Sequence, residues 1–221
     1  MDQLVSRAAQ RLRELPRGMF IALEGGDGSG KTTQINLLRQ RLEAHGANVL
    51  TTFEPGATPL GHQLRELVMH GPEDVDPRTE ALLYAADRAY HVATMIRPAL
   101  AAGTTVITDR YLDSSVAYQG IGRGLGERAI RDLSLWATDG LLPDAVIVLN
   151  IDPEVGLSRR GEEKDRLERA GDRFHEQVAR HYQEAARLEP GRYRLVDANG
   201  SVEETFTGVV TALLEVLGGD R

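Results

Sequence analysis

The sequence predicts an α/β protein of one domain, built on a five-stranded parallel sheet with helices on both faces. Five short apolar segments have the length of buried strands, and longer segments with helical periodicity lie between them. Strands that alternate with helices are typical of a parallel sheet with right-handed crossovers. The 221 residues, 41% of them hydrophobic, suffice to bury one core. The third observation is a glycine-rich stretch over residues 25–32, just after the first predicted strand.

The first half of the chain opens with an amphipathic segment. Over residues 2–15, five apolar side chains share one helical face, and Pro16 and Gly18 end the segment. The apolar run 19–23 is short enough for a buried strand, and the segment 34–42 has helical spacing. The next predicted elements are a strand over 47–53, a loop over 54–61, helices over 60–70 and 78–96, and a short helical stretch around Pro98.

The second half contains the most apolar predicted strand. Residues 145–151 are apolar almost without interruption, as expected of a central strand covered on both faces. The glycines from Gly120 to Gly126 predict a break between helices. The segment 154–189 is charged and mostly helical in pattern, and we expect a lid at about 156–172, where apolar periodicity is missing. The other predicted elements are strands over 103–109 and 194–197, and helices over 112–118, up to Trp136, and over 202–217.

The pattern divides the chain into an N-terminal helical extension, residues 1–18, and a domain over residues 19–217. The arginines of the extension are compatible with an organelle-targeting leader. Asp2 and Glu14 argue against a leader, because such leaders are poor in acidic residues. We therefore expect a short helix that packs on the domain or binds a partner.

Charge and composition exclude several classes of partner. The formal net charge of −7 argues against a general affinity for nucleic acid or for acidic membranes, so an anionic ligand needs a local cluster of arginines. No apolar run approaches the roughly 20 residues that span a bilayer. The chain contains no cysteine, which fits a reducing compartment, and we expect the cytoplasm.

The stretch 25–32 has the phosphate-binding loop pattern of a glycine, four variable residues and Gly-Lys-Thr. Glycines let consecutive backbone N–H groups face a phosphate, and the following helix adds its positive end. Lys31 is expected to reach the β- and γ-phosphates of ATP, and Thr32 to ligate Mg²⁺. A glycine turn that only connects two elements is the alternative. The expected ATP-binding residues are Gly25, Gly26, Asp27, Gly28, Ser29, Gly30, Lys31 and Thr32.

A phosphate-binding loop alone does not separate a kinase from a GTPase, a motor or a binding protein. A guanine-reading Asn-Lys-x-Asp pattern is missing after the late predicted strands, which argues against a GTPase. Arg65, Arg88 and Arg110 recur where they could clamp a small phosphate-accepting substrate. An ATP-binding regulator has no need of such a clamp. Another nucleoside monophosphate kinase stays open as an alternative.

Six motifs, in the same order, resemble those of bacterial thymidylate kinases, which belong to the P-loop nucleoside monophosphate kinase superfamily. The similarity begins before the phosphate-binding loop and runs from about residue 19 to residue 217. The resemblance implies a P-loop kinase fold with a short lid, phosphoryl transfer from ATP to dTMP to give dTDP, Mg²⁺ as cofactor, and a homodimer. Besides the loop, the motifs are Glu54-Pro-Gly56, Tyr84-Ala-Ala-Asp-Arg88, Asp109-Arg-Tyr111, Ala117-Tyr-Gln-Gly120 and Asp165-Arg-Leu-Glu168.

The resemblance also implies roles for single residues. Arg65 and Arg110 are expected to grip the dTMP phosphate, which suits the planar guanidinium fork. Asp27 resembles the carboxylate that holds the deoxyribose 3′-hydroxyl near Mg²⁺. Asp109 is expected to orient a metal-bound water or Arg110. The alternatives are a turn-forming role for Asp27, a helix cap for Asp109 and plain surface charge for the arginines.

Two pairs of residues are expected to recognise the nucleoside. Tyr84 and Arg88 lie four residues apart, so the ring can cover the thymine while the guanidinium bonds its O4 edge. Core packing is the alternative for Tyr84. By the resemblance, Ser115 reads the base N3 and Tyr118 crowds the sugar 2′ position.

The chain departs from the family pattern at three points. Phe53 stands where many bacterial relatives have an arginine near the acceptor, the lid is shorter than in some relatives, and the N-terminal helix has no counterpart in the motifs. The variable positions of the phosphate-binding loop carry no positive charge. We therefore expect a catalytic arginine from the lid, Arg160 or Arg166, to act with Lys31 and Arg110. A solvated charged helix is the alternative for the lid.

Overall fold

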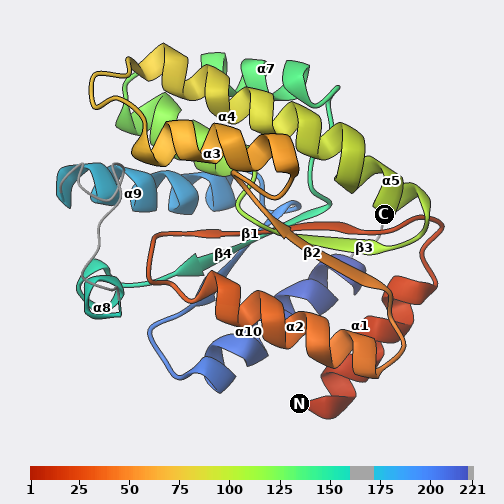
Figure 1. Cartoon of the computed structure of the whole chain (residues 1–221). Coiled ribbons are helices and arrows are strands. Elements are labelled where there is room, and N and C mark those ends of the chain that lie inside the picture. The colour runs from red at the N-terminus through yellow and green to blue at the C-terminus, as the bar shows by residue number, and fades with distance from the viewer. Residues whose placement is uncertain (160–171, 219–221) are drawn as a thin grey trace.

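The computed structural model describes residues 1–159 and 172–218, which form a three-layer α/β structure (Figure 1). Its centre is one sheet of five parallel strands in the order β2-β3-β1-β4-β5. The predicted parallel sheet with helices on both faces is therefore confirmed. The strands are β1 (Phe20–Gly25), β2 (Val49–Phe53), β3 (Thr105–Asp109), β4 (Ala145–Asn150) and β5 (Tyr193–Asp197).

Burial of the strands follows their place in the sheet. All six residues of β1 are buried, because β1 lies in the middle and helices cover both of its faces. The two outer strands, β2 and β5, are only partly buried. Leu23 lies beside Asp109, and Gly25 lies beside Leu149. The register therefore brings the carboxyl ends of β1, β3 and β4 to one edge, where ligands bind in open α/β sheets.

Two helical layers cover the sheet. The helices of one layer are α1 (Asp2–Arg13), α2 (Lys31–Ala44) and α10 (Val202–Gly218). The other layer holds α3 (Pro59–His70), α4 (Pro77–His91), α5 (Arg97–Ala101), α6 (Leu112–Ser115), α7 (Glu127–Ala137) and α9 (Asp172–Leu188). The short helix α8 (Pro153–Ser158) follows β4. Because successive residues of a strand face opposite sides, Ile21 and Leu23 join the core of the first layer, whereas Phe20 and Ala22 join the second.

Helix α1 packs into the main core. Val5, Ala8, Ala9 and Leu12 are buried in the same cluster as apolar residues of α2 and α10. The sequence predicted that this helix either packs on the domain or binds a partner, and the structure shows it packed on the domain. No helix in the described part of the chain is long and apolar enough to cross a membrane.

Two predicted helix boundaries differ from the structure. The predicted helix 78–96 is α-helical only to His91 and continues as a π-helical turn over Val92–Ile96. The helix after β3 does not end at Gly120, because a π-helical segment runs over Val116–Gly122. A Cβ at Gly120 would lie 3.2 Å from the Cα of Glu127, so this glycine permits close packing on α7 rather than a break. The predicted lid falls largely on residues 160–171, outside the described residues.

Candidate active site

The phosphate-binding loop joins the end of β1 to the start of α2, as predicted. Gly25, Gly28 and Gly30 have φ values of 135°, 79° and 87°, a region that favours glycine. A Cβ at Gly28 would lie 2.3 Å from the carbonyl oxygen of Gly156 in α8. The backbone therefore forms an open turn at the N-terminus of α2, which suits an anion. The hydroxyl of Ser29 is buried and has no partner among the described residues, as expected of a loop that binds a ligand.

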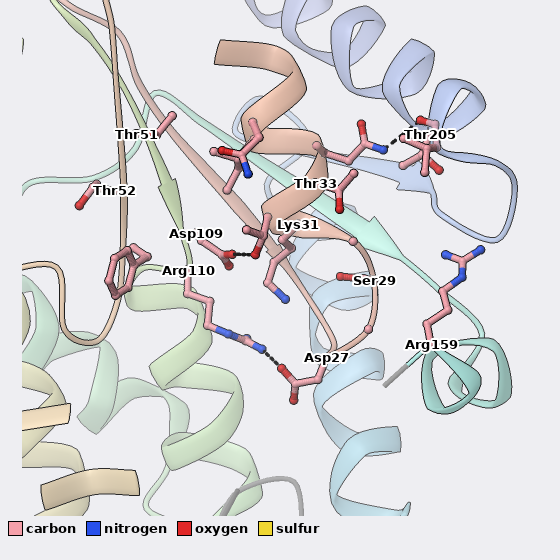
Figure 2. Close-up of a pocket in the computed structure, with 18 of the residues that line it drawn as sticks. Asp27, Ser29, Lys31, Thr33, Thr51, Thr52, Asp109, Arg110, Arg159 and Thr205 are labelled. Atoms are coloured by element: carbon pink, nitrogen blue, oxygen red, sulfur yellow. Dashed lines mark hydrogen bonds and ion pairs between the residues drawn. The ribbon is translucent and has the colours of Figure 1, made fainter. Parts of the chain in front are cut away.

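Lys31 curls back over the loop (Figure 2). Its Nζ donates hydrogen bonds to the carbonyl oxygens of Gly25 and Gly26, both at 3.1 Å. Burial lowers the pKa of Lys31, and so does the nearby Arg110, whereas Asp109 and Asp27 raise it. The amine thus lies inside the phosphate cradle, where a phosphate would replace the two carbonyl oxygens as its partner.

Thr32 and Asp109 form a pair of oxygen ligands beside the loop. The hydroxyl of Thr32 donates to the Oδ2 of Asp109 at 2.9 Å. Hydroxyl and carboxylate oxygens are suitable ligands for Mg²⁺, which usually keeps several waters and phosphate oxygens as well. Within the described residues no group of three or more His, Asp or Glu side chains could hold a metal alone. The pair therefore fits a magnesium ion that arrives with the nucleotide. The carboxylate of Asp109 accepts from Thr32 on another element, and the cap residue of the following helix α6 is Tyr111, so the structure does not show Asp109 as a helix cap.

Arg110 is held from several sides. It forms an ion pair with Asp27 of the loop, and it donates to the hydroxyls of Ser114 at 3.0 Å and Tyr118 at 3.3 Å. Its guanidinium carbon lies 5.0 Å from the ring centre of Tyr118. Burial opposes the charge of Arg110, but Tyr118 and Asp27 outweigh it and raise the pKa well above the usual value. The group is therefore a fixed cation (Figure 2).

A cavity beside the loop collects the predicted acceptor residues. All seven of them line it, although they come from four separate stretches of the chain. They are Asp27, Arg65, Tyr84, Arg88, Arg110, Ser115 and Tyr118. Glu54, Pro55, Met69 and Gln119 also line this cavity, and the prediction assigned them no role. Glu54 and Gln119 belong to the recognised motifs, which was the one signal for them in the sequence.

Arg88 lies at the floor of this acceptor cavity. The residue is 1% exposed, and it donates to Glu54, Ser134, Ser115 and the backbone carbonyl of Tyr111 at 2.7–3.2 Å. Glu54 is held in turn by His91 at 3.0 Å. These four bonds use four of the five N–H groups of a guanidinium, so one N–H has no hydrogen-bond partner within residues 1–159 and 172–218 and could serve a ligand.

Arg65 lies at the mouth of the acceptor cavity. Its Nη1 donates to the carbonyl oxygen of Pro55 at 2.8 Å, and its side chain passes over Gly56. A larger cavity follows the phosphate-binding loop and the start of α2. Asp27, Glu54, Arg65 and Arg110 line both cavities. The two cavities therefore meet at these four charged residues, next to Lys31. Two substrates that exchange a phosphoryl group must lie in such adjoining cavities.

Comparisons with known proteins agree with this arrangement. The family model for thymidylate kinase matches residues 23–209. The chain belongs to the thymidylate kinase family. It is 48% identical to the thymidylate kinase of Bifidobacterium longum strain NCC 2705 over 90% of this chain and 98% of that protein. It is 53% identical to that of Leifsonia xyli subsp. xyli over 85% of this chain and 90% of that protein. The crystal structure of thymidylate kinase from Ehrlichia chaffeensis matches with a TM-score of 0.74 at 31% identity, over 90% of this chain and 99% of that one.

In this thymidylate kinase family member, the far side of the larger cavity is formed by the loop between β5 and α10. Arg159 donates to the carbonyl oxygens of Ala198 at 2.9 Å, Gly200 at 3.1 Å and Asn199 at 3.2 Å. Gln34 of α2 donates to the carbonyl oxygen of Val202 at 3.0 Å. The loop is thus fastened to both α8 and α2.

Two further expectations concern Phe53 and the lid arginines. Phe53 lines the larger cavity and is 45% exposed, so the position near the acceptor carries an apolar ring in place of a cation. Arg160 and Arg166 lie outside the described residues. Their proposed catalytic role stays a prediction.

Proposed function

We propose that this chain transfers the γ-phosphoryl group of ATP to dTMP and forms dTDP. The observation that carries the proposal is the cluster of Asp27, Glu54, Arg65 and Arg110, which lines both cavities at the phosphate-binding loop. ATP would place its phosphates in the loop, and dTMP would place its phosphate at the shared cluster. The acceptor oxygen and the γ-phosphorus then meet between Lys31 and Arg110.

The acceptor cavity supports recognition of a pyrimidine nucleotide. Tyr84 and Arg88 line it together with Ser115, and Arg88 keeps one N–H for the O4 of thymine. Tyr118 also lines the cavity, and we propose that its ring would crowd a ribose 2′-hydroxyl. Arg65 and Arg110 would bind the dTMP phosphate, because each can offer two parallel donors to it.

The donor half would supply the electrostatic part of catalysis. The backbone N–H groups of residues 25–32 and the amine of Lys31 would hold the β- and γ-phosphates. Thr32, Asp109 and Asp27 would hold Mg²⁺, which would neutralise part of the negative charge of the phosphates. Asp27 pairs with Arg110 in this structure, so the deoxyribose 3′-hydroxyl or the metal would have to share this carboxylate with the arginine.

The activity is tested by ADP release with dTMP, dUMP, dCMP, dGMP or AMP as acceptor, with dTDP identified by chromatography. We expect release that depends on the acceptor and is fastest with dTMP. Equal rates with AMP would show a different nucleoside monophosphate kinase. Nucleotide binding without any acceptor-dependent release would show a regulator.

We further propose a homodimer formed through α3 and α4. These neighbouring helices expose four large apolar side chains, Leu60, Leu67, Leu82 and Tyr90. A second copy would cover them and so gain hydrophobic free energy. Sedimentation should show a dimer, and Leu82→Asp should convert it to a monomer. A wild-type protein that sediments as a monomer would contradict this part. Location in the cytoplasm stays a prediction from the sequence.

A further inference from the structure

Glu24 is a buried carboxylate with no place in the proposed reaction. It follows Leu23 in β1 and immediately precedes the phosphate-binding loop, and its exposed fraction is 0%. Four donors surround it. The backbone N–H groups of Tyr111 and Ser114 lie at 2.8 and 3.3 Å, and the hydroxyls of Ser114 and Tyr182 lie at 2.6 and 2.8 Å.

Ser114 connects this carboxylate to Arg110. The Oγ of Ser114 donates to Glu24 at 2.6 Å and accepts from the Nη1 of Arg110 at 3.0 Å. A hydroxyl has one proton, so the bond to Glu24 turns the lone pairs of Ser114 toward the arginine. Tyr182, on α9, lies 3.2 Å from the same Oγ. The hydrogen-bonded group therefore runs from α9 through Glu24 and Ser114 to Arg110.

The backbone of Arg110 also depends on this group. Arg110 has φ of +69°, which residues other than glycine rarely adopt. Its own N–H donates to the carbonyl oxygen of Leu23 at 3.0 Å, and the N–H of the next residue, Tyr111, donates to Glu24. Two consecutive residues of β1 thus hold both sides of an unfavourable turn. Such a conformation persists only where the surroundings fix it.

We propose that Glu24 and Tyr182 are positioning residues that hold Arg110 in the direction needed to bind the acceptor phosphate. The proposal rests on the role of Arg110 under the proposed function. It adds that two groups that need not touch either substrate set the affinity for dTMP. Tyr182 acts on the carboxylate, and the carboxylate acts on both the backbone and the side chain of Arg110.

Tyr182→Phe is the variant that tests this, because it removes one hydroxyl and keeps the ring in the core. Tyr193→Phe is the matched control. Tyr193 is buried in the same apolar cluster, and its hydroxyl donates to another buried carboxylate, that of Asp113. Each variant removes one hydroxyl together with the buried hydrogen bonds that it makes, so both should lose stability. We expect Tyr182→Phe alone to raise the Kd for dTMP, by about tenfold, with the KM for ATP changed less than about twofold.

A double-mutant cycle decides whether the effect passes through Arg110. Calorimetric titration of dTMP is the measurement, because it needs no turnover. In the Arg110→Ala background, Tyr182→Phe should change the Kd by less than about twofold. A full effect in that background, or equal effects of Tyr182→Phe and Tyr193→Phe, would overturn the proposal. Glu24→Gln, if it folds, should exceed Tyr182→Phe in its effect on Kd. A wild-type protein that neither binds nor phosphorylates dTMP would instead contradict the proposed function.

Discussion

The donor and acceptor halves of the site are built in different ways. The donor half is one contiguous stretch, residues 25–32, in which the backbone forms the cradle. The acceptor cavity is assembled from side chains that several elements bring together. A cradle made of backbone depends on local conformation, whereas a cavity made of side chains depends on tertiary packing. Changes in the donor half should therefore affect turnover alone, and changes in the acceptor half should affect affinity and stability together.

The largest effect should come from Lys31→Ala. We expect turnover to fall by about 10³-fold or more, because the variant loses a cation beside the transferring phosphoryl group. The thermal unfolding midpoint should change little, since the hydrogen bonds of the amine among the described residues are to backbone carbonyls of the loop. Steady-state kinetics and thermal unfolding measure this. Arg39→Ala is the control, because Arg39 lies on the same helix and pairs with the exposed Glu43 on the surface. Near-normal turnover of the Lys31 variant would contradict the donor mechanism.

The second effect should come from the predicted lid. Arg166→Ala should lower turnover several hundredfold with dTMP binding unchanged, since arginine fingers contribute on the order of 10³ to 10⁵ in other P-loop enzymes. Arg160→Ala should do so only if Arg160 is the group that reaches the phosphoryl oxygens. Kinetics and calorimetric titration of both variants measure this. If neither loses tenfold in turnover, the catalytic charge must come from Lys31, Mg²⁺ and Arg110.

Arg88→Ala should show the opposite behaviour to Lys31→Ala. It removes the arginine that pairs with the buried Glu54 and leaves that carboxylate with His91, so the free energy of unfolding should fall by about 3 kcal/mol. The KM for dTMP should rise more than about tenfold, and the preference for pyrimidine acceptors should weaken. Urea unfolding and kinetics with dTMP and AMP measure both effects. Unchanged stability and selectivity would contradict the expectation that changes in the acceptor half affect affinity and stability together.

The smallest effect is a dependence of stability on pH, and it comes from Glu24, which lies between the donor and acceptor halves of the site. Burial raises the pKa of Glu24 to about 7, and Asp113 raises it too, whereas Ser114, Arg110 and Tyr182 lower it. Because this pKa lies above the ordinary glutamate value of 4.5, the folded state binds the proton more tightly than the unfolded state. The resulting stability is fully present below about pH 4.5 and is lost as the pH rises through about 7.

Glu24→Gln, which does not titrate, isolates this contribution. From pH 4.5 to 7.5, the free energy of unfolding of the wild type should fall by up to about 3 kcal/mol relative to the variant. Urea unfolding at several pH values measures the difference. Parallel curves for the two proteins would show that Glu24 ionises normally.

The sequence was sufficient for the elements whose signals are local. Apolar runs and helical spacing predicted all five strands and most helices, and the phosphate-binding loop was recognised in its correct context. Helical spacing placed Tyr84 and Arg88 on one face, but the resemblance, and not spacing, brought them together with Arg65, Ser115 and Tyr118. Their common cavity became visible only in the fold.

The missed features depend on contacts between distant residues. Glu24 and Tyr182 are 158 positions apart, and nothing in either segment marks them as partners. Glu24 sits in an apolar strand, so its burial was predictable, but the donors around it were not. The π-helical segment over Val116–Gly122 was missed because Gly120 and Gly122 favour a break. The predicted break comes a few residues later, over residues 123–126, and Gly120 packs closely on α7.

The contact between Gly28 and Gly156 has a consequence for inhibitors. Two backbones meet there without side chains, one from the phosphate-binding loop and one from α8, and a Cβ at Gly28 would lie 2.3 Å from a carbonyl oxygen. Gly28 also has φ of +79°, so any other residue would be strained there. A compound that binds against Gly28 and Gly156 would therefore contact positions where few substitutions are tolerated. Resistance to it would have to arise at more distant positions, where a change of side chain does not also displace the loop.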